Sequence, residues 1–272
     1  MLGCWYTTRH REVGLGYGWL LRGTYVLMAV ASAYIGFASG SSSSAATIRD
    51  IGAVVAAIGI ALGLVQSIVR RKAGVSGYSN EHDRRSQRVA EMTGIDRDDS
   101  VRQLESGKEF DPLIDLLPVA IGLVALIAAG VSDGGNDGVA IVRTLVGAGF
   151  LGFVSDAMLL GHWYLVQPGL PRRHVNDIVR TFLVIWPLEV IVMLIPTGMF
   201  SVFSGTVDDG WKGQLGWFWA ACAITTGVLS VVTLKALQER TYSGVMAATG
   251  LMYLAILTAF GTDLVARAVL AG

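Results

Sequence analysis

Charge is scarce in this sequence and has no excess of either sign. Only 15% of the 272 residues are charged, and 21 basic residues balance 21 acidic ones. A soluble domain would carry about 25% charged residues, so lipid is the expected solvent for most of this chain. The balance also provides no net field for attracting nucleic acid, and we expect no nucleic-acid partner.

Cysteine and the common catalytic motifs are nearly absent as well. The two cysteines, Cys4 and Cys222, are far apart and offer neither a disulfide framework nor paired thiolate ligands for a metal. The sequence contains no phosphate-binding glycine loop, no CxxC pair, no zinc-protease helix and no nucleophile elbow. An enzymatic activity is therefore neither indicated nor excluded.

What the chain has is long hydrophobic runs, within an overall hydrophobic content of 53%. A helix needs roughly 20 apolar residues to cross a hydrocarbon core about 30 Å thick. We predict an all-α, polytopic membrane helix bundle with about seven transmembrane helices, which form a single transmembrane domain over residues 1–272. The predicted spans are 16–39, 48–69, 113–131, 139–166, 178–200, 215–237 and 243–270.

Basic residues alternate between the predicted connections. Lys and Arg accumulate in cytoplasmic loops, so the basic connections are assigned to the cytoplasm. The pattern predicts a cytoplasmic N-terminus, a C-terminus outside, and a multi-pass location in the inner (cytoplasmic) membrane of the cell. The residues of the basic set are Arg9, Arg11, Arg70, Arg71, Lys72, Arg172, Arg173, Arg180, Lys235 and Arg240.

The second connection, residues 70–111, is the only long polar segment. It is too polar to form a core of its own. We expect a cytoplasmic connecting segment with short amphipathic helices at 80–92 and 100–110. It would lie on the membrane surface or provide a docking surface for a soluble partner.

Several charged residues lie near the ends of the predicted spans. Arg22 is expected to extend its long side chain to the headgroups, and Asp115 to cap a helix N-terminus. Asp263 is expected to pair with Arg143 or with Arg267, the second of which lies at helical i,i+4 spacing. We interpret these residues as structural.

Two carboxylates, Asp156 and Glu189, lie deep in predicted spans. An ionisable group at this depth costs roughly 2.5 to 3.5 kcal/mol, so it calls for a functional explanation. Pro187 and Pro196 interrupt the helix that carries Glu189 and free backbone carbonyls. A broken helix with a carboxylate is typical of a proton or ion pathway, although hydrogen bonding between helices is the competing interpretation.

Chemistry-bearing side chains are concentrated near the cytoplasmic end of the fourth span. His162 is the only histidine inside a predicted span. Its imidazole is suited to ligate the metal of a haem or chlorophyll, or to donate a hydrogen bond to a quinone. An interfacial histidine among belt aromatics is the structural alternative. The candidate cofactor-binding residues are Gly152, Ser155, His162, Trp163 and Tyr164, with His162 as the metal ligand.

Three functions therefore remain open. The first is a membrane subunit of a respiratory or photosynthetic electron-transfer complex that holds haem, chlorophyll or quinone at His162 and has partner subunits. The second is a proton-coupled or ion transporter that uses Glu189 and Asp156. The third is a purely structural membrane subunit, which contacts lipid and neighbouring subunits only.

Overall fold

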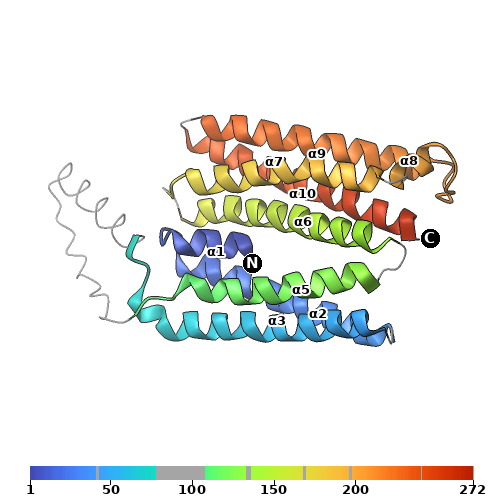
Figure 1. The fold of residues 1–272 in the computed structure, drawn as a ribbon. Helices are drawn as coiled ribbons and strands as arrows, with labels where there is room; N and C mark the ends of the chain where they lie inside the picture. Colours follow the sequence, from blue (N-terminus) through green and yellow to red (C-terminus); the bar gives the residue numbers. More distant parts are fainter. Residues whose placement is uncertain are drawn as a thin grey trace. The chain divides into compact units, whose positions relative to one another are not determined.

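The computed structural model describes residues 1–40, 43–77, 108–132, 136–167, 170–195, 198–239 and 241–271. Every regular element in these ranges is a helix (Figure 1), so the predicted all-α class is confirmed. The amphipathic helices predicted at 80–92 and 100–110 fall on or run into residues 78–107, which lie outside the described residues.

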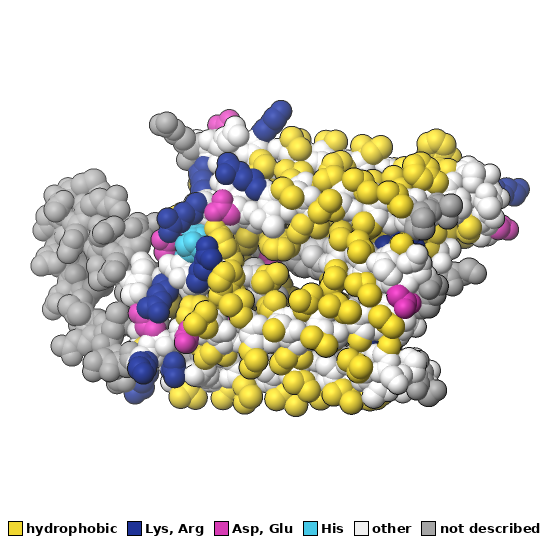
Figure 2. Space-filling view, in the orientation of Figure 1, with side chains coloured by type: hydrophobic (Ala, Val, Ile, Leu, Met, Phe, Trp, Pro, Cys, Tyr) yellow, Lys and Arg dark blue, Asp and Glu magenta, His cyan; other side chains and the backbone are white. Residues whose placement is uncertain are grey.

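Six of the helical stretches in the described ranges are long and apolar enough to cross a membrane. On the face drawn in Figure 2, hydrophobic side chains cover the middle of the helices, and charged side chains gather near helix ends. The chain is therefore a multi-pass α-helical membrane protein. The six candidate spans are Leu15–Ala38, Ser44–Ala73, Pro112–Ser132, Asp137–Val166, Gln214–Gln238 and Tyr242–Leu270.

The chain forms two compact units. Unit 1 comprises Met1–Ser41 and Asp50–Gly122, and unit 2 comprises Ser42–Arg49 and Leu123–Gly272. Two helices, α3 (Ser44–Val69) and α5 (Leu116–Ser132), contribute residues to both units.

Unit 1 contains all of α2 (Leu15–Ala38), most of α3 and the start of α5. It also contains the short helix α1 (Leu2–Arg9) and the 3-10 turns η1 (Arg70–Ala73) and η2 (Pro112–Asp115). The η2 turn begins where it does because Pro112 lacks an N–H and the Asp111 carboxylate accepts the Leu113 N–H at 3.0 Å. The helix α1 has only 8 residues, which is too short to cross a membrane, and it packs against η2.

Unit 2 contains α6 (Asp137–Val166), α7 (Arg173–Leu194), α8 (Gly198–Phe203), α9 (Gln214–Gln238) and α10 (Tyr242–Ala271). In Figure 1, α10 lies along α9 and α6, and α7 packs on α6 and α9. The Asn136 side chain caps α6 by accepting the N–H groups of Gly138 and Val139. Phe150 of α6 stacks on Phe182 of α7 with ring centroids 5.1 Å apart, which fixes the register of these two helices.

The fifth predicted span differs from the helix observed. The prediction continued to residue 200, whereas α7 ends at Leu194 and a separate helix, α8, begins at Gly198. Ile195 is already extended, with φ −105° and ψ 148°. The cause is local, because a residue that precedes a proline is disfavoured in the helical region, and residue 196 is a proline.

Candidate functional site

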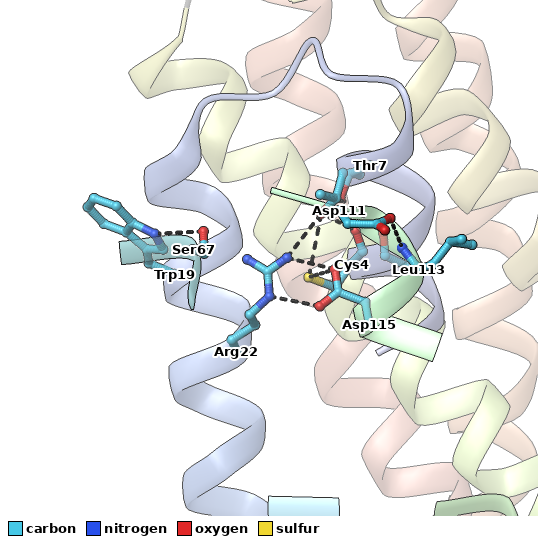
Figure 3. Close-up of polar contacts among 10 residues, drawn as sticks. Cys4, Thr7, Trp19, Arg22, Ser67, Asp111, Leu113 and Asp115 are labelled. Carbon is cyan, nitrogen blue, oxygen red and sulfur yellow. Dashed lines mark hydrogen bonds and ion pairs between the residues drawn. The ribbon is translucent and has the colours of Figure 1, made fainter. Parts of the chain in front are cut away.

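A buried ion pair joins Arg22 of α2 to Asp115 of η2 within unit 1 (Figure 3). The guanidinium donates from Nε to Oδ1 at 2.8 Å and from Nη2 to Oδ2 at 2.6 Å, and both side chains are almost completely buried. The ring of Phe110 covers the guanidinium at 4.2 Å. Cys4 of α1 donates from Sγ to Asp115 Oδ2 at 3.8 Å, so the pair also holds the N-terminal helix in place.

This pair corrects two sequence-based expectations. Arg22 does not extend to the headgroups but turns inward, with 1% of its surface exposed. The carboxylate of Asp115 binds the Arg22 guanidinium, and the cap of η2 is provided by Asp111. Both differences have one cause, since a charge at this depth is stabilised far better by a bidentate partner than by distant headgroups.

Unit 2 contains a second charge cluster, in which three helices bring two buried acids together with two partly exposed arginines. Glu189 of α7 and Asp263 of α10 are 0% and 2% exposed and lie next to each other, with Arg143 of α6 and Arg267 of α10 beside them. We call these four residues the carboxylate cluster. The two acids and two bases balance in number, but they come from segments up to 124 residues apart in sequence.

The two arginines of the carboxylate cluster have different contacts. Arg267 donates from Nε to both oxygens of Asp263, at 2.8 and 2.9 Å, which confirms the predicted i,i+4 pair. Its Nη2 also donates to the carbonyl of Arg143 at 2.9 Å and so ties α10 to α6. Arg143 instead donates to two backbone carbonyls at the end of α7, those of Val192 at 2.9 Å and Ile195 at 2.8 Å.

The carbonyl of Val192 is available to Arg143 because of the sequence that follows it. In an uninterrupted helix this carbonyl would accept the N–H of residue 196, but that residue is a proline and has no N–H. Arg143 therefore replaces a missing helical hydrogen bond with a charge-assisted one. One of the two cations beside Glu189, Arg143, thus also holds the end of α7.

Glycine at position 147 makes room for the carboxylate cluster on α6. A Cβ there would lie 2.1 Å from Arg267 Nη2 and 2.7 Å from Asp263 Oδ1, so any side chain would displace both groups. The small size of Gly147 thus permits the close approach of α10 to α6 at this position. A Cβ added at Gly152, further along α6, would have no neighbouring atom within 4 Å.

Glu189 is the unusual member of the cluster. Its side chain is fully buried, and no described residue donates a hydrogen bond to Oε1 or Oε2 unless a proton is shared with the neighbouring Asp263 carboxyl. Buried carboxyl oxygens in folded proteins are nearly always hydrogen-bonded, and an exception calls for an explanation. Packing alone does not explain it, because an apolar side chain would fill the same space without the cost of desolvation.

Asp156 lies elsewhere in unit 2. The stacking of Phe150 on Phe182 sets α6 against antiparallel α7 so that Arg143 faces Glu189, and Asp156 is thirteen residues further along α6. At 1.5 Å per residue the two acids are separated by about 20 Å along the bundle. Asp156 is buried, at 3% exposure, but the structure does not bring it together with Glu189.

The candidate cofactor residues of α6 do not share one face. His162 is exposed and contacts the edge of Tyr253 at a centroid distance of 6.3 Å. Tyr164 points inward and donates its hydroxyl to the carbonyl of Pro171, and Trp163 donates to Gln167. Ser155 bonds to the carbonyl of Leu151 in its own helix.

A small cavity lies in the interior beside this part of α6. Its volume is about 10 Å³, and it is lined by Gly161, Tyr164 and Thr249 among others. That volume is about the size of one water molecule. Among the described residues no three His, Cys, Asp or Glu side chains are grouped so as to hold a metal ion. A planar cofactor at His162 would therefore have to lie on the outer face of α6.

One acidic residue outside the spans, Asp209, accepts several backbone hydrogen bonds. Asp209, in the turn before α9, accepts the N–H groups of Gly213 at 2.8 Å and of Trp211 and Leu215 at 2.9 Å. Partial desolvation acts to raise the pKa of Asp209, but these hydrogen bonds outweigh it and lower the pKa below its ordinary value. The carboxylate therefore organises the start of α9.

Sequence reasoning identified Glu189 but not its partners. Only Asp263 and Arg267 had a local signal, their i,i+4 spacing, and nothing in the sequence connected them to α7. Comparisons with family models, with curated proteins and with solved structures found no match for this chain. The geometry of the chain itself must therefore carry any functional conclusion.

Proposed function

We propose that this chain is a membrane transport protein that moves protons, alone or coupled to a second ion, with Glu189 and Asp263 as its proton-holding site. The observation that carries the proposal is the buried Glu189 carboxyl, which lies beside the buried Asp263 carboxyl and can form a hydrogen bond with it only if the two share a proton. A residue that only held helices together would be hydrogen-bonded.

The proposed topology has seven spans, with α7 as the fifth. The helix α7 is not among the six candidate spans, because it contains the charged residues Asp177, Arg180 and Glu189. Its 22 residues nevertheless give it a length of about 33 Å, enough to cross the hydrocarbon core. It packs on both α6 and α9, which are candidate spans themselves. Seven spans would place the N-terminus in the cytoplasm and the C-terminus outside, in an inner membrane, by the distribution of basic residues.

The chemistry proposed for the carboxylate cluster is proton exchange between two carboxyls. With one proton between them, Glu189 and Asp263 are a hydrogen-bond donor and an acceptor. Without it, two adjacent carboxylates face Arg143 and Arg267, which compensate their charge. Asp156, about 20 Å along the bundle, is proposed as a separate station on the same pathway.

Arg143 offers a way to couple the proton to a conformational change. It lies beside Glu189, and it also donates to the two carbonyls at the end of α7. A negative charge on Glu189 would attract the guanidinium away from those carbonyls, and a proton would release it to them. We propose that the segment after Leu194, where α7 ends, moves in response.

The proposal is tested with the purified chain in sealed vesicles that enclose a pH-sensitive dye. Imposed gradients of Na⁺ or K⁺, with a set membrane potential, should produce a pH change in the lumen. Glu189→Gln should abolish it, because an amide keeps the shape and hydrogen-bonding capacity but cannot exchange a proton. The matched control is Glu239→Gln, at an exposed position past the end of α9. Equal flux in wild type and Glu189→Gln would refute the proposal.

A second proposal rests on the exposed imidazole of His162. A histidine on the surface of an apolar helix is unusual, and a flat cofactor shared with a partner subunit would explain it. The chain would then be a subunit of an electron-transfer complex that contacts a haem, chlorophyll or quinone. Purification from native membranes with and without His162→Leu, followed by absorption spectra and quinone extraction, tests this idea. Identical cofactor content in the two preparations would reject it.

A further inference from the structure

An open groove lies at the end of α3 in unit 1, and it shares no residue with the carboxylate cluster of unit 2. Its volume is about 570 Å³, and its lining includes Arg11, Gln66, Arg70, Lys108 and Ile114. Arg71 and Lys72 follow directly in η1. Five basic residues therefore lie in or beside the groove, at the point where a candidate span ends.

The acidic residues of the groove are already engaged. Glu109 forms an ion pair with Arg11 at 3.0 Å, and its carbonyl accepts from Arg70 at 3.1 Å. The carboxylate of Asp111 caps η2. Arg71 and Lys108, by contrast, are exposed and have no side-chain partner among the described residues. Within the described part of the chain, the groove and η1 together therefore have an excess of positive charge that can attract an anion.

The surroundings of the groove are those of a lipid rather than of a soluble anion. Val69, which directly precedes Arg70, is 73% exposed, and Leu113, which directly precedes the groove residue Ile114, is 65% exposed. Trp19 of α2, an interfacial type of residue, donates its indole N–H to Ser67 of α3 at 3.1 Å nearby. Basic side chains next to the exposed apolar end of a span are typical of sites for anionic lipids.

We infer that this groove binds the phosphate headgroup of an anionic phospholipid, with the acyl chains against Val69 and Leu113. Arg70, Arg71 and Lys108 would contact the headgroup. The Arg11–Glu109 ion pair would connect the segment after α1 to the chain before η2 and so stabilise one wall of the groove.

The inference is tested by native mass spectrometry of the purified chain titrated with dioleoyl phosphatidylglycerol, and separately with the phosphatidylcholine of the same chain length. The test variant is Arg71→Gln/Lys108→Gln. The control variant, Arg180→Gln/Lys235→Gln, removes the same charge from exposed positions of unit 2. Circular dichroism checks that both variants fold.

We expect the wild type and the control to retain phosphatidylglycerol more tightly than phosphatidylcholine. Because each basic residue at a membrane surface contributes about fivefold to the binding of an anionic lipid, the test variant should bind phosphatidylglycerol about 25-fold more weakly and phosphatidylcholine unchanged. Equal weakening in both variants would show a general charge effect and overturn the inference, as would unchanged binding in the test variant. Competition by soluble glycerol phosphate at concentrations near those of the lipid would also overturn it, since the acyl contacts would then contribute nothing.

Discussion

Removing one partner of the Arg22–Asp115 pair should strongly destabilise the protein. In Asp115→Leu the guanidinium of Arg22 would keep only Thr8 Oγ1 at 3.5 Å and the Phe110 ring at 4.2 Å. Both side chains of the pair are at most 2% exposed, so the guanidinium would lose its bidentate partner while shielded from bulk solvent. A charge left buried in this way costs about 3 to 5 kcal/mol.

The assay is equilibrium unfolding in mixed micelles, followed by tryptophan fluorescence. Arg22→Met/Asp115→Leu should be within about 1.5 kcal/mol of wild type, because replacing both charges with apolar groups is often neutral. Arg11→Gln provides the comparison in the same unit, since the Arg11–Glu109 pair has side-chain exposures of 48% and 21% and is worth about 1 kcal/mol or less. A cost below about 1 kcal/mol for Asp115→Leu, or a double variant as unstable as the single one, would refute this reasoning.

Two further predictions concern unit 2. Gly147→Ala should disrupt the contact of α10 with α6 and so lower both the melting temperature and the proton flux. Gly152→Ala, in the same helix, should leave both unchanged. Equal effects of the two substitutions would contradict the close approach at Gly147. The contribution of Asp209 to stability should be fully present above its unfolded pKa of about 3.9 and lost as the pH falls through its lower folded pKa. Asp209→Asn should therefore be less stable than wild type at neutral pH and approach it in acid, and parallel pH profiles of melting temperature would contradict this.

The spans could be predicted from sequence because the physics that defines them is local. Hydrocarbon cannot hydrate the backbone, so each long apolar run must form a helix, and the observed α2, α6, α9 and α10 begin and end within two residues of the predicted bounds. The same principle gave the wrong end for the fifth span, because hydropathy continues past Leu194 while the proline at 196 does not permit the helix to continue.

The partners of the charged residues could not be predicted, because they depend on helix packing. Arg22 and Asp115 are 93 residues apart, and a rule based on helix ends assigned each of them a separate local role. Glu189 was identified by its depth and by the prolines at positions 187 and 196 of the same predicted span. Its neighbours became evident only when the register of α6 and α7 was known from Phe150 and Phe182. The pair of Asp263 and Arg267 was accessible beforehand because it lies within one turn of a helix.

The central claim is that an exchangeable proton resides at Glu189 and Asp263. Infrared difference spectroscopy of the reconstituted chain across its stable pH range tests this directly, because a protonated carboxyl has a stretching band separate from that of carboxylate and amide groups. We predict a pH-dependent carboxyl band that shifts in deuterium oxide, disappears in Glu189→Gln and remains in Glu239→Gln. A spectrum that is the same in wild type and Glu189→Gln would contradict the account.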